Sequence, residues 1–217
     1  GTGAVPGPVD TVLGSLGYAV TRLGGADRYE TSVLVAQKLT GADRFFIAYG
    51  GNFPDALSAS APAAHLQIPV LLTRTDRLPP AVQTYLSAHT PFVNAYVVGD
   101  ESVVGAPVAA AIDPYVSGAV KRLAGPTRYE TSLEIAREFW PTPSISAGVA
   151  TGATYPDALT GAVLCADHNG PLLITPPTVL HTGVAGYLTS GRTPRVTVFG
   201  GTGAISTDVR CAIEALW

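Results

Sequence analysis

Short apolar runs alternate with longer amphipathic stretches along the whole chain. The runs are four or five residues long, and most are continuously apolar and rich in β-branched side chains. This pattern is typical of strands that are covered on both faces of a parallel sheet. We therefore predict strands over residues 19–23, 45–49, 70–73 and 95–98, and again over 119–123, 148–151, 172–175 and 196–199.

The amphipathic stretches between these runs predict helices. Their expected starts lie near Arg28, Pro54, Pro79, Pro107, Arg128, Pro156, Thr178 and Ser206, and several carry the proline that is favoured in a first turn. Asp27 with Glu30, and Thr127 with Glu130, have the spacing of a capping box. Regular alternation of strand and helix predicts an α/β fold in which a mostly parallel sheet is flanked by helices.

The chain contains two copies of one pattern. Residues 20–32 read Val-Thr-Arg-Leu-Gly-Gly-Ala-Asp-Arg-Tyr-Glu-Thr-Ser, and residues 120–132 read Val-Lys-Arg-Leu-Ala-Gly-Pro-Thr-Arg-Tyr-Glu-Thr-Ser. Phe-Pro-Asp-Ala-Leu at 53–57 likewise recurs as Tyr-Pro-Asp-Ala-Leu at 155–159. We therefore divide the chain into copy 1, residues 1–100, and copy 2, residues 101–217. Gly-Thr-Gly-Ala opens the chain and returns at 201–204, which favours an origin in a longer array with a further copy upstream.

The composition of the chain excludes several classes of function. Of 217 residues, 47% are hydrophobic and 13% are charged, which is enough apolar side chain for a buried core. The net charge is -3, so the chain lacks the excess of positive charge that binding to nucleic acid requires. No apolar run is long enough to span a membrane, and nothing indicates a cofactor or a metal site. The absence of methionine favours a processed or excised product. Cys165 and Cys211 are either free thiols or one disulfide, and we favour the disulfide.

Polar residues recur just after the predicted strands, where ligands bind in such sheets. They are Arg28, Asn52, Asp55 and Thr73 in copy 1, and Arg128, Thr154, Asp157 and Thr175 in copy 2. Arginine beside helix N-termini suits phosphate or carboxylate, so these eight residues form the predicted ligand-binding set. Each also has a purely structural interpretation: helix capping for the aspartates, ion pairs with a neighbouring repeat for the arginines, and strand ends or loops for the others.

Signs of catalysis are weak. None of the four histidines has a partner at a spacing typical of a metal site or a triad, and no nucleophile elbow or phosphate-binding loop occurs. We therefore predict no catalytic residues. One alternative is a cell-wall hydrolase or esterase that uses Asp55 or Asp157, with His65 or His168 nearby. Another is a surface-layer or adhesin module whose partner is a protein.

The repeated motifs resemble the type 2 cell-wall-binding repeat family of Gram-positive surface proteins. The resemblance rests on Arg-Leu-Gly-Gly-Ala-Asp-Arg-Tyr-Glu-Thr at 22–31, Asn-Phe-Pro-Asp-Ala-Leu-Ser-Ala at 52–59, Pro-Val-Leu-Leu-Thr at 69–73 and Val-Val-Gly at 97–99. It implies secretion to the cell wall or cell surface and a Toprim-like or Rossmann-like unit. It also implies non-covalent binding of an anionic secondary wall polymer or peptidoglycan, with a separate domain supplying any activity.

The chain departs from the family pattern in three places. The family commonly packs three repeats around a pseudo-threefold centre, whereas two complete copies are present here, so further repeats in cis or in trans are candidate partners. Copy 2 has Pro126-Thr127 where an acidic residue often precedes the arginine, and Gly-Ala-Thr at 152–154 in place of Gly-Gly-Asn.

Overall fold

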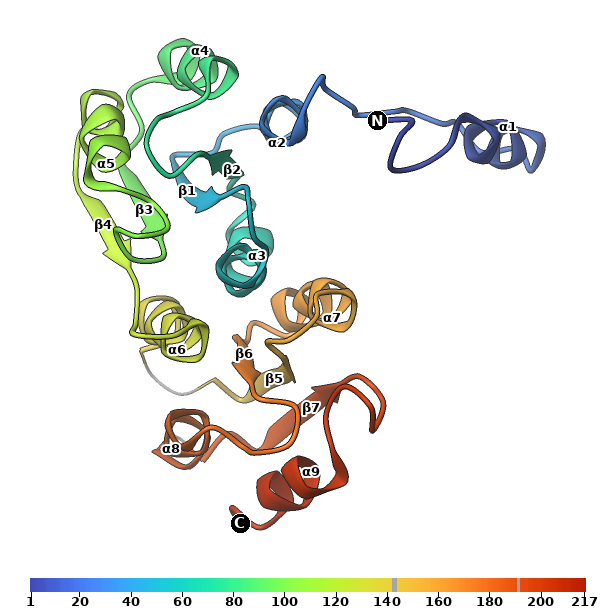
Figure 1. Cartoon of the computed structure of the whole chain (residues 1–217), viewed down its shortest axis with the longest axis vertical. Coiled ribbons are helices and arrows are strands. Elements are labelled where there is room, and N and C mark those ends of the chain that lie inside the picture. Colours follow the sequence, from blue (N-terminus) through green and yellow to red (C-terminus); the bar gives the residue numbers. More distant parts are fainter. Residues whose placement is uncertain (142–143, 191) are drawn as a thin grey trace.

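The strands form two parallel sheets in the computed structural model, which describes residues 1–141, 144–190 and 192–217 (Figure 1). The first sheet has the order β2-β1-β3-β4 and the second the order β6-β5-β7. Their bounds are β1 Arg44–Tyr49, β2 Val70–Thr73, β3 Asn94–Val98, β4 Val120–Leu123, β5 Ser146–Thr151, β6 Leu172–Thr175 and β7 Arg195–Phe199. All pairings are parallel, and seven of the eight predicted strands are confirmed.

Helices cover both faces of each sheet, which confirms the predicted α/β class. The helices of the described residues are α1 Gly7–Ser15, α2 Arg28–Ala36, α3 Pro54–Leu66, α4 Pro80–His89, α5 Ala106–Ile112, the short 3-10 helix Asp113–Tyr115, α6 Arg128–Phe139, α7 Pro156–Asp167, α8 Thr182–Ser190 and α9 Thr207–Glu214. Helices α2, α4 and α5 share one core with the first sheet, and α8 and α9 share another with the second. Helix α8 begins later than predicted, because the Thr175 hydroxyl accepts a hydrogen bond from the His181 amide and keeps the intervening residues in a turn.

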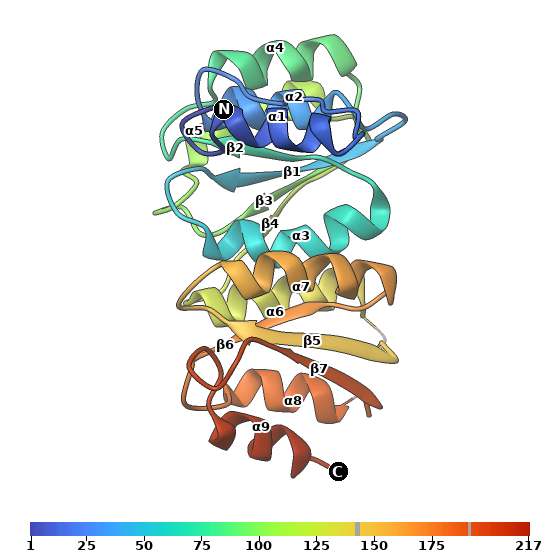
Figure 2. The same ribbon diagram turned by 90° about the vertical axis from the view of Figure 1, so that its right-hand side faces the viewer.

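The two sheets are joined through a middle layer of helices. Figure 2 shows α3 and α7 side by side between the sheets. Leu57 and Ala61 of α3 are buried among residues of α7 and β5, so a helix of the first repeat completes the core of the second sheet. Helix α6 packs against both sheets: Ile135 contacts the first sheet and Leu133 contacts the second. The two repeats therefore share their hydrophobic cores.

The predicted strand at 19–23 is wrong. Its counterpart in the second copy, β4, is a strand because it pairs with β3, with Ala95 opposite Val120. Residues 19–23 instead follow α1, and no sheet edge in the described part of the chain lies beside them. Helix α1 lies to one side of both sheets in Figure 1 and buries none of its residues. Val9 is 40% exposed, whereas the equivalent Val108 and Val209 are fully buried.

The division at residue 100 stays a prediction, but the elements just beyond it pack with the first sheet. Val108 and Ile112 of α5 belong to the core cluster on that sheet. Strand β4 then forms the edge of the same sheet before the chain enters α6. The first sheet is thus completed by residues that the sequence repeat assigns to copy 2.

The two predicted capping boxes differ in detail. Thr127 and Glu130 form a complete box at the start of α6, with the Thr127 amide donating to Glu130 at 3.1 Å. At α2, the Asp27 carboxylate accepts from the Glu30 amide at 2.9 Å, but the Glu30 carboxylate accepts from the Ala26 amide instead of that of Asp27. Both helix starts are nevertheless capped by the predicted residue.

The favoured disulfide is also wrong, because Cys165 and Cys211 are both free thiols. Cys165 lies on α7 in the middle layer, where a Cβ at Gly148 of β5 would come within 2.3 Å of its sulfur. Cys211 lies on α9, across the second sheet, and is exposed. Burial raises the pKa of the Cys165 thiol to about 12, so this cysteine is a packing residue in its unreactive, protonated form.

Candidate functional site

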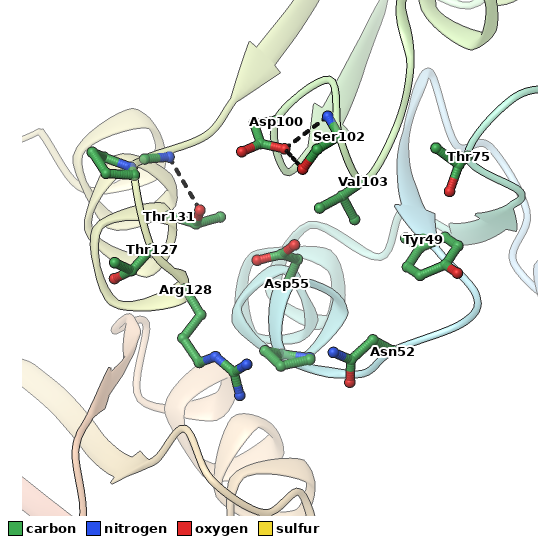
Figure 3. Close-up of a pocket in the computed structure, with 13 residues that line it drawn as sticks. Tyr49, Asn52, Asp55, Thr75, Asp100, Ser102, Val103, Thr127, Arg128 and Thr131 are labelled. Carbon is green, nitrogen blue, oxygen red and sulfur yellow. Dashed lines mark hydrogen bonds between the residues drawn. The ribbon is translucent and has the colours of Figure 1, made fainter.

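A cavity of about 250 Å³ lies beyond the carboxyl ends of β1, β3 and β4. It is lined by Tyr49, Asn52, Pro54, Asp55, Thr75, Asp100, Ser102, Val103, Gly125, Pro126, Thr127, Arg128 and Thr131 (Figure 3). The chain passes from β1 to its neighbour β2 and then crosses back to β3 on the other side of β1, so the cavity lies at the point where the strand order reverses, a topological switch point. We call it the junction pocket, because its walls come from both repeats.

The floor of the junction pocket is built around Asp55, in the first turn of α3. A close approach of α3 to the end of β3 holds this residue in place. Gly99 follows β3 with a φ of +97°, a conformation that favours glycine, and a Cβ there would lie 2.9 Å from Oδ2 of Asp55. The chain can therefore bring the carboxylate against the backbone of β3 only if residue 99 has no side chain.

The Asp55 carboxylate accepts no hydrogen bond from the residues that the structure describes. Burial raises its pKa above the ordinary value, and the nearby charge of Asp100 raises it further, while Arg128 acts in the opposite direction. Asp55 is half-buried and lines the pocket, so its carboxylate oxygens are open to solvent and can accept hydrogen bonds from a ligand.

Asp100 forms the opposite wall and is fixed by its own loop. Its Oδ1 accepts hydrogen bonds from the Ser102 amide at 2.9 Å and from the Ser102 hydroxyl at 2.5 Å. The hydroxyl bond is the main reason that the pKa of Asp100 is lowered, so this carboxylate is ionised. Figure 3 shows Asp55 lying between the Asp100 loop and the Arg128 side chain.

Arg128 enters from the second repeat, at the first position of α6. Its Nη1 donates to the Gly152 carbonyl at 2.6 Å, which leaves the other guanidinium nitrogens for a ligand. The preceding loop is closed by a bond from the Gly125 amide to the Thr131 hydroxyl at 3.1 Å. The capped α6 N-terminus and the guanidinium thus give this wall its positive character.

The structure places three of the eight predicted site residues in the junction pocket: Asn52, Asp55 and Arg128. Thr73 and Thr175 are buried, and their hydroxyls donate to the carbonyls of Arg77 and Val179, each at 3.1 Å, so they act as strand-end residues. The participation of these two in binding is not supported by their geometry.

Arg28 repeats the structural role of Arg128 but lines another surface. Its guanidinium donates to the Gly50 carbonyl, just as Arg128 donates to Gly152. It borders an open, largely apolar groove of about 620 Å³ that also contains Phe53 and Tyr155, whose ring centroids are 5.4 Å apart. The sequence did not reveal this arginine-to-glycine contact, although both residues recur in the two copies.

The second repeat reproduces only part of the junction pocket. Asp157 starts α7 beside Gly200, whose φ is +111° and where a Cβ would lie 2.8 Å from Oδ2 of Asp157. Within the described residues, however, the second sheet ends at β7 and has no equivalent of β4 and α6, the elements that bring Arg128 to the first sheet. Gly201 stands where the first repeat has Asp100, and Thr154 is exposed.

Sequence reasoning missed the part of the pocket that follows β3 and β4. Asp100 and Ser102 come directly after Val97-Val98-Gly99, so the strand-end rule that identified Asp55 would also have found them. Thr127 was recognised as a helix cap and not as a wall of the pocket. Within the described residues, no group of three or more His, Cys, Asp or Glu side chains could hold a metal ion, and no helix could cross a membrane.

Comparisons with known proteins agree with the duplicated fold. The family model described as Cell wall binding domain 2 (CWB2) matches residues 22–109 and again 122–210. Among curated proteins, the chain is 28% identical to N-acetylmuramoyl-L-alanine amidase LytC of Bacillus subtilis (strain 168), over 96% of this chain and 41% of the relative. It is 33% identical to the Amidase enhancer of the same organism, over 72% of this chain and 22% of the relative.

Two solved structures share the arrangement of both repeats. Cwp6 from Clostridium difficile superposes with a TM-score of 0.87 at 26% identity, over 96% of this chain and 33% of that one. Cwp8 from Clostridium difficile superposes with a TM-score of 0.86 over the full length of this chain and 37% of that one. At 24% identity, Cwp8 supports the fold alone. In all four cases the chain spans less than half of the related protein.

Proposed function

The chain belongs to the Cell wall binding domain 2 family and is therefore a wall-binding domain of the bacterial cell surface, and on this premise we propose that it holds an anionic wall glycopolymer in the junction pocket. The proposal rests on one observation: Arg128 of the second repeat lines the same pocket as Asn52 and Asp55 of the first. A guanidinium with free nitrogens at a helix N-terminus suits the phosphate or carboxylate groups of such a polymer.

We assign the binding to the junction pocket as a whole, with Asn52, Asp55 and Arg128 as its predicted contacts. The hydroxyl oxygens of Ser102 and Thr127 and the side-chain amide of Asn52 line its walls and can hydrogen-bond sugar hydroxyls. A contribution of Arg28, Thr154 and Asp157 stays a prediction. The attachment is non-covalent, so a polymer that offers many identical units would be held by rebinding as well as by one contact.

We propose that the domain itself is not catalytic. In the described part of the chain, no histidine lines the junction pocket. His65 lies near the far end of α3, about 15 Å along the helix from Asp55, and its Nδ1 is 3.2 Å from the Ala166 carbonyl. The alternative of a hydrolase that pairs Asp55 with His65 therefore has no support in the geometry. The amidase relative is more than twice as long as the matched region, which leaves room for a catalytic part elsewhere.

The proposal is tested by retention on purified wall sacculi, before and after chemical extraction of the anionic polymer. We expect Arg128→Ala to weaken retention by about 10- to 100-fold, because a charge-assisted hydrogen bond to the polymer is lost. Arg28→Ala is measured beside it, because it removes the same type of bond to a glycine carbonyl outside the pocket, and we expect it to weaken retention less than Arg128→Ala does.

Three outcomes would contradict the proposal. Retention of the Arg128 variant equal to that of the unchanged protein would place the polymer elsewhere. Undiminished binding to extracted walls would point to peptidoglycan, and loss of binding only after protease treatment of the walls would indicate a protein partner.

A further inference from the structure

The junction pocket carries more negative than positive charge, although the polymer proposed for it is anionic. Its lining contains two carboxylates, Asp55 and Asp100, against one guanidinium, Arg128. Asp100 is ionised and fixed by Ser102, so it cannot turn away without losing two hydrogen bonds. A ligand with only negative groups would be repelled from this side of the pocket.

The geometry separates the charges along the pocket instead of pairing them. Neither aspartate lies within ion-pair distance of Arg128, which donates a hydrogen bond to the Gly152 carbonyl. Figure 3 shows Arg128 reaching the lower rim beside Asn52, while Asp55 and Asp100 lie above it around the hollow. One end of the pocket is thus suited to an anion and the other to a hydrogen-bond donor or cation.

The Asp55 side is set up to accept hydrogen bonds. Its carboxylate is partly buried against Gly99 and has no donor among the described residues. Asp100 uses Oδ1 for Ser102. An ammonium group offers three donors and a positive charge, and it can therefore satisfy carboxylates from two different loops at once.

We infer that the junction pocket recognises a zwitterionic unit of the wall polymer, namely an amino sugar with an unsubstituted ammonium group next to a phosphate or carboxylate. The ammonium lies between Asp55 and Asp100, and the anionic group lies against Arg128. This inference rests on the proposed function and specifies its ligand: the polymer is anionic overall, and the unit that the pocket selects also carries a positive charge.

The test compares three ligands that share a sugar ring and a phosphate: glucosamine 6-phosphate, N-acetylglucosamine 6-phosphate and glucose 6-phosphate. Binding to the full chain is measured by calorimetry or by NMR shifts, at a pH where the amine is protonated. We expect the free amine to bind at least about tenfold more tightly than either of the others, because only it provides a charge-assisted hydrogen bond to the carboxylates. Equal binding of the three, or no binding of the amine, would overturn the inference.

Paired variants connect this preference to the pocket. Asp55→Asn is expected to abolish the preference for the amine, whereas Asp157→Asn, the same change beside Gly200 and outside the pocket, is expected to retain it. If both variants retain the preference, the amine is bound at another site and the assignment to Asp55 is wrong. Thermal unfolding of both variants shows whether each is folded.

A wall-level experiment separates this inference from the proposed function. Treating sacculi with acetic anhydride converts free amines to amides and leaves phosphate groups in place. Retention that falls on acetylated walls supports the inference. Retention that is unchanged on acetylated walls but lost on polymer-extracted walls overturns the amino-sugar inference and leaves the proposed function intact. Retention on both preparations contradicts both.

Discussion

Asp55 and Asp157 occupy the same position in the two repeats but differ in their surroundings. Each begins a helix after the first strand of its sheet and lies against a glycine with positive φ. Asp55 also faces Asp100 and Arg128, which enter from the loop after β3 and from the next repeat. Duplication therefore supplied two equivalent carboxylates, and the neighbouring elements made one of them part of a pocket.

A stability measurement tests whether Asp55 is held at an energetic cost. Its pKa is raised in the folded state, so between the unfolded and folded pKa values the folded protein binds more protons and stability falls as pH rises. Asp55→Asn removes the buried charge, and we expect the melting temperature at neutral pH to rise by about 1–3 °C.

Because Asp55 is protonated in both the folded and the unfolded state below about pH 3, this gain should vanish there. Melting curves across this pH range provide the check, with Asp157→Asn measured in parallel. A lower melting temperature for Asp55→Asn at neutral pH would mean that the charge stabilises the fold.

At the scale of elements, the start of α6 has a structural role and, in the proposed function, a role in binding. Thr127 and Glu130 cap the helix, and Thr127 and Arg128 line the junction pocket. The equivalent start of α2 is capped by Asp27, but its Arg28 lines the apolar groove and not the junction pocket. One sequence motif thus starts a helix in both repeats, and what it faces depends on the element packed in front of it.

Two cap variants distinguish these roles. Thr127→Ala should lower the free energy of unfolding by about 1 kcal/mol and also weaken wall retention, because the α6 N-terminus would be less well ordered at the pocket. Ser206 caps α9 through the Val209 amide, far from the pocket. Ser206→Ala should therefore cost a similar free energy in chemical denaturation and leave retention unchanged. Equal retention of the two variants would show that the α6 cap is structural only.

At the scale of the whole molecule, the two repeats do not have separate cores. Leu57 of α3 packs in the cluster under the second sheet, and α6 contributes to clusters on both sheets. Trp140, at the end of α6, is 6% exposed in this shared region and donates its indole N–H to Asn169 at 2.8 Å. Unfolding one repeat would expose apolar surface of the other, which favours cooperative unfolding.

This cooperativity can be measured with the buried tryptophan. In a Trp217→Phe background, Trp140 fluorescence and far-UV circular dichroism should report one coincident denaturant transition. Leu57→Ala should shift both probes together, by about 2–4 kcal/mol, although the mutated residue lies in the first repeat. Two separated transitions, or a shift of one probe alone, would show that the repeats unfold independently.

The sequence by itself determined the elements and their order. Seven strands and the capped helix starts followed from local periodicity and from residues such as Asp27 and Thr127, because these signals depend on near neighbours in the chain. The family and the duplication were also readable, since the motifs recur at a nearly constant offset. Asn52, Asp55 and Arg128 could be named as candidates from their places after strands, and all three line the junction pocket.

Only the tertiary structure decided which of these residues meet. A strand needs an edge to pair with, so 120–123 forms β4 and the equivalent residues 20–23 do not. The same pairing carries α6 to the end of the first sheet and brings Arg128 of one repeat to Asp55 of the other. Contacts of this kind join residues more than 70 positions apart. They arise because α3 packs against α6 and α7, and a pattern among near neighbours in the sequence does not predict that packing.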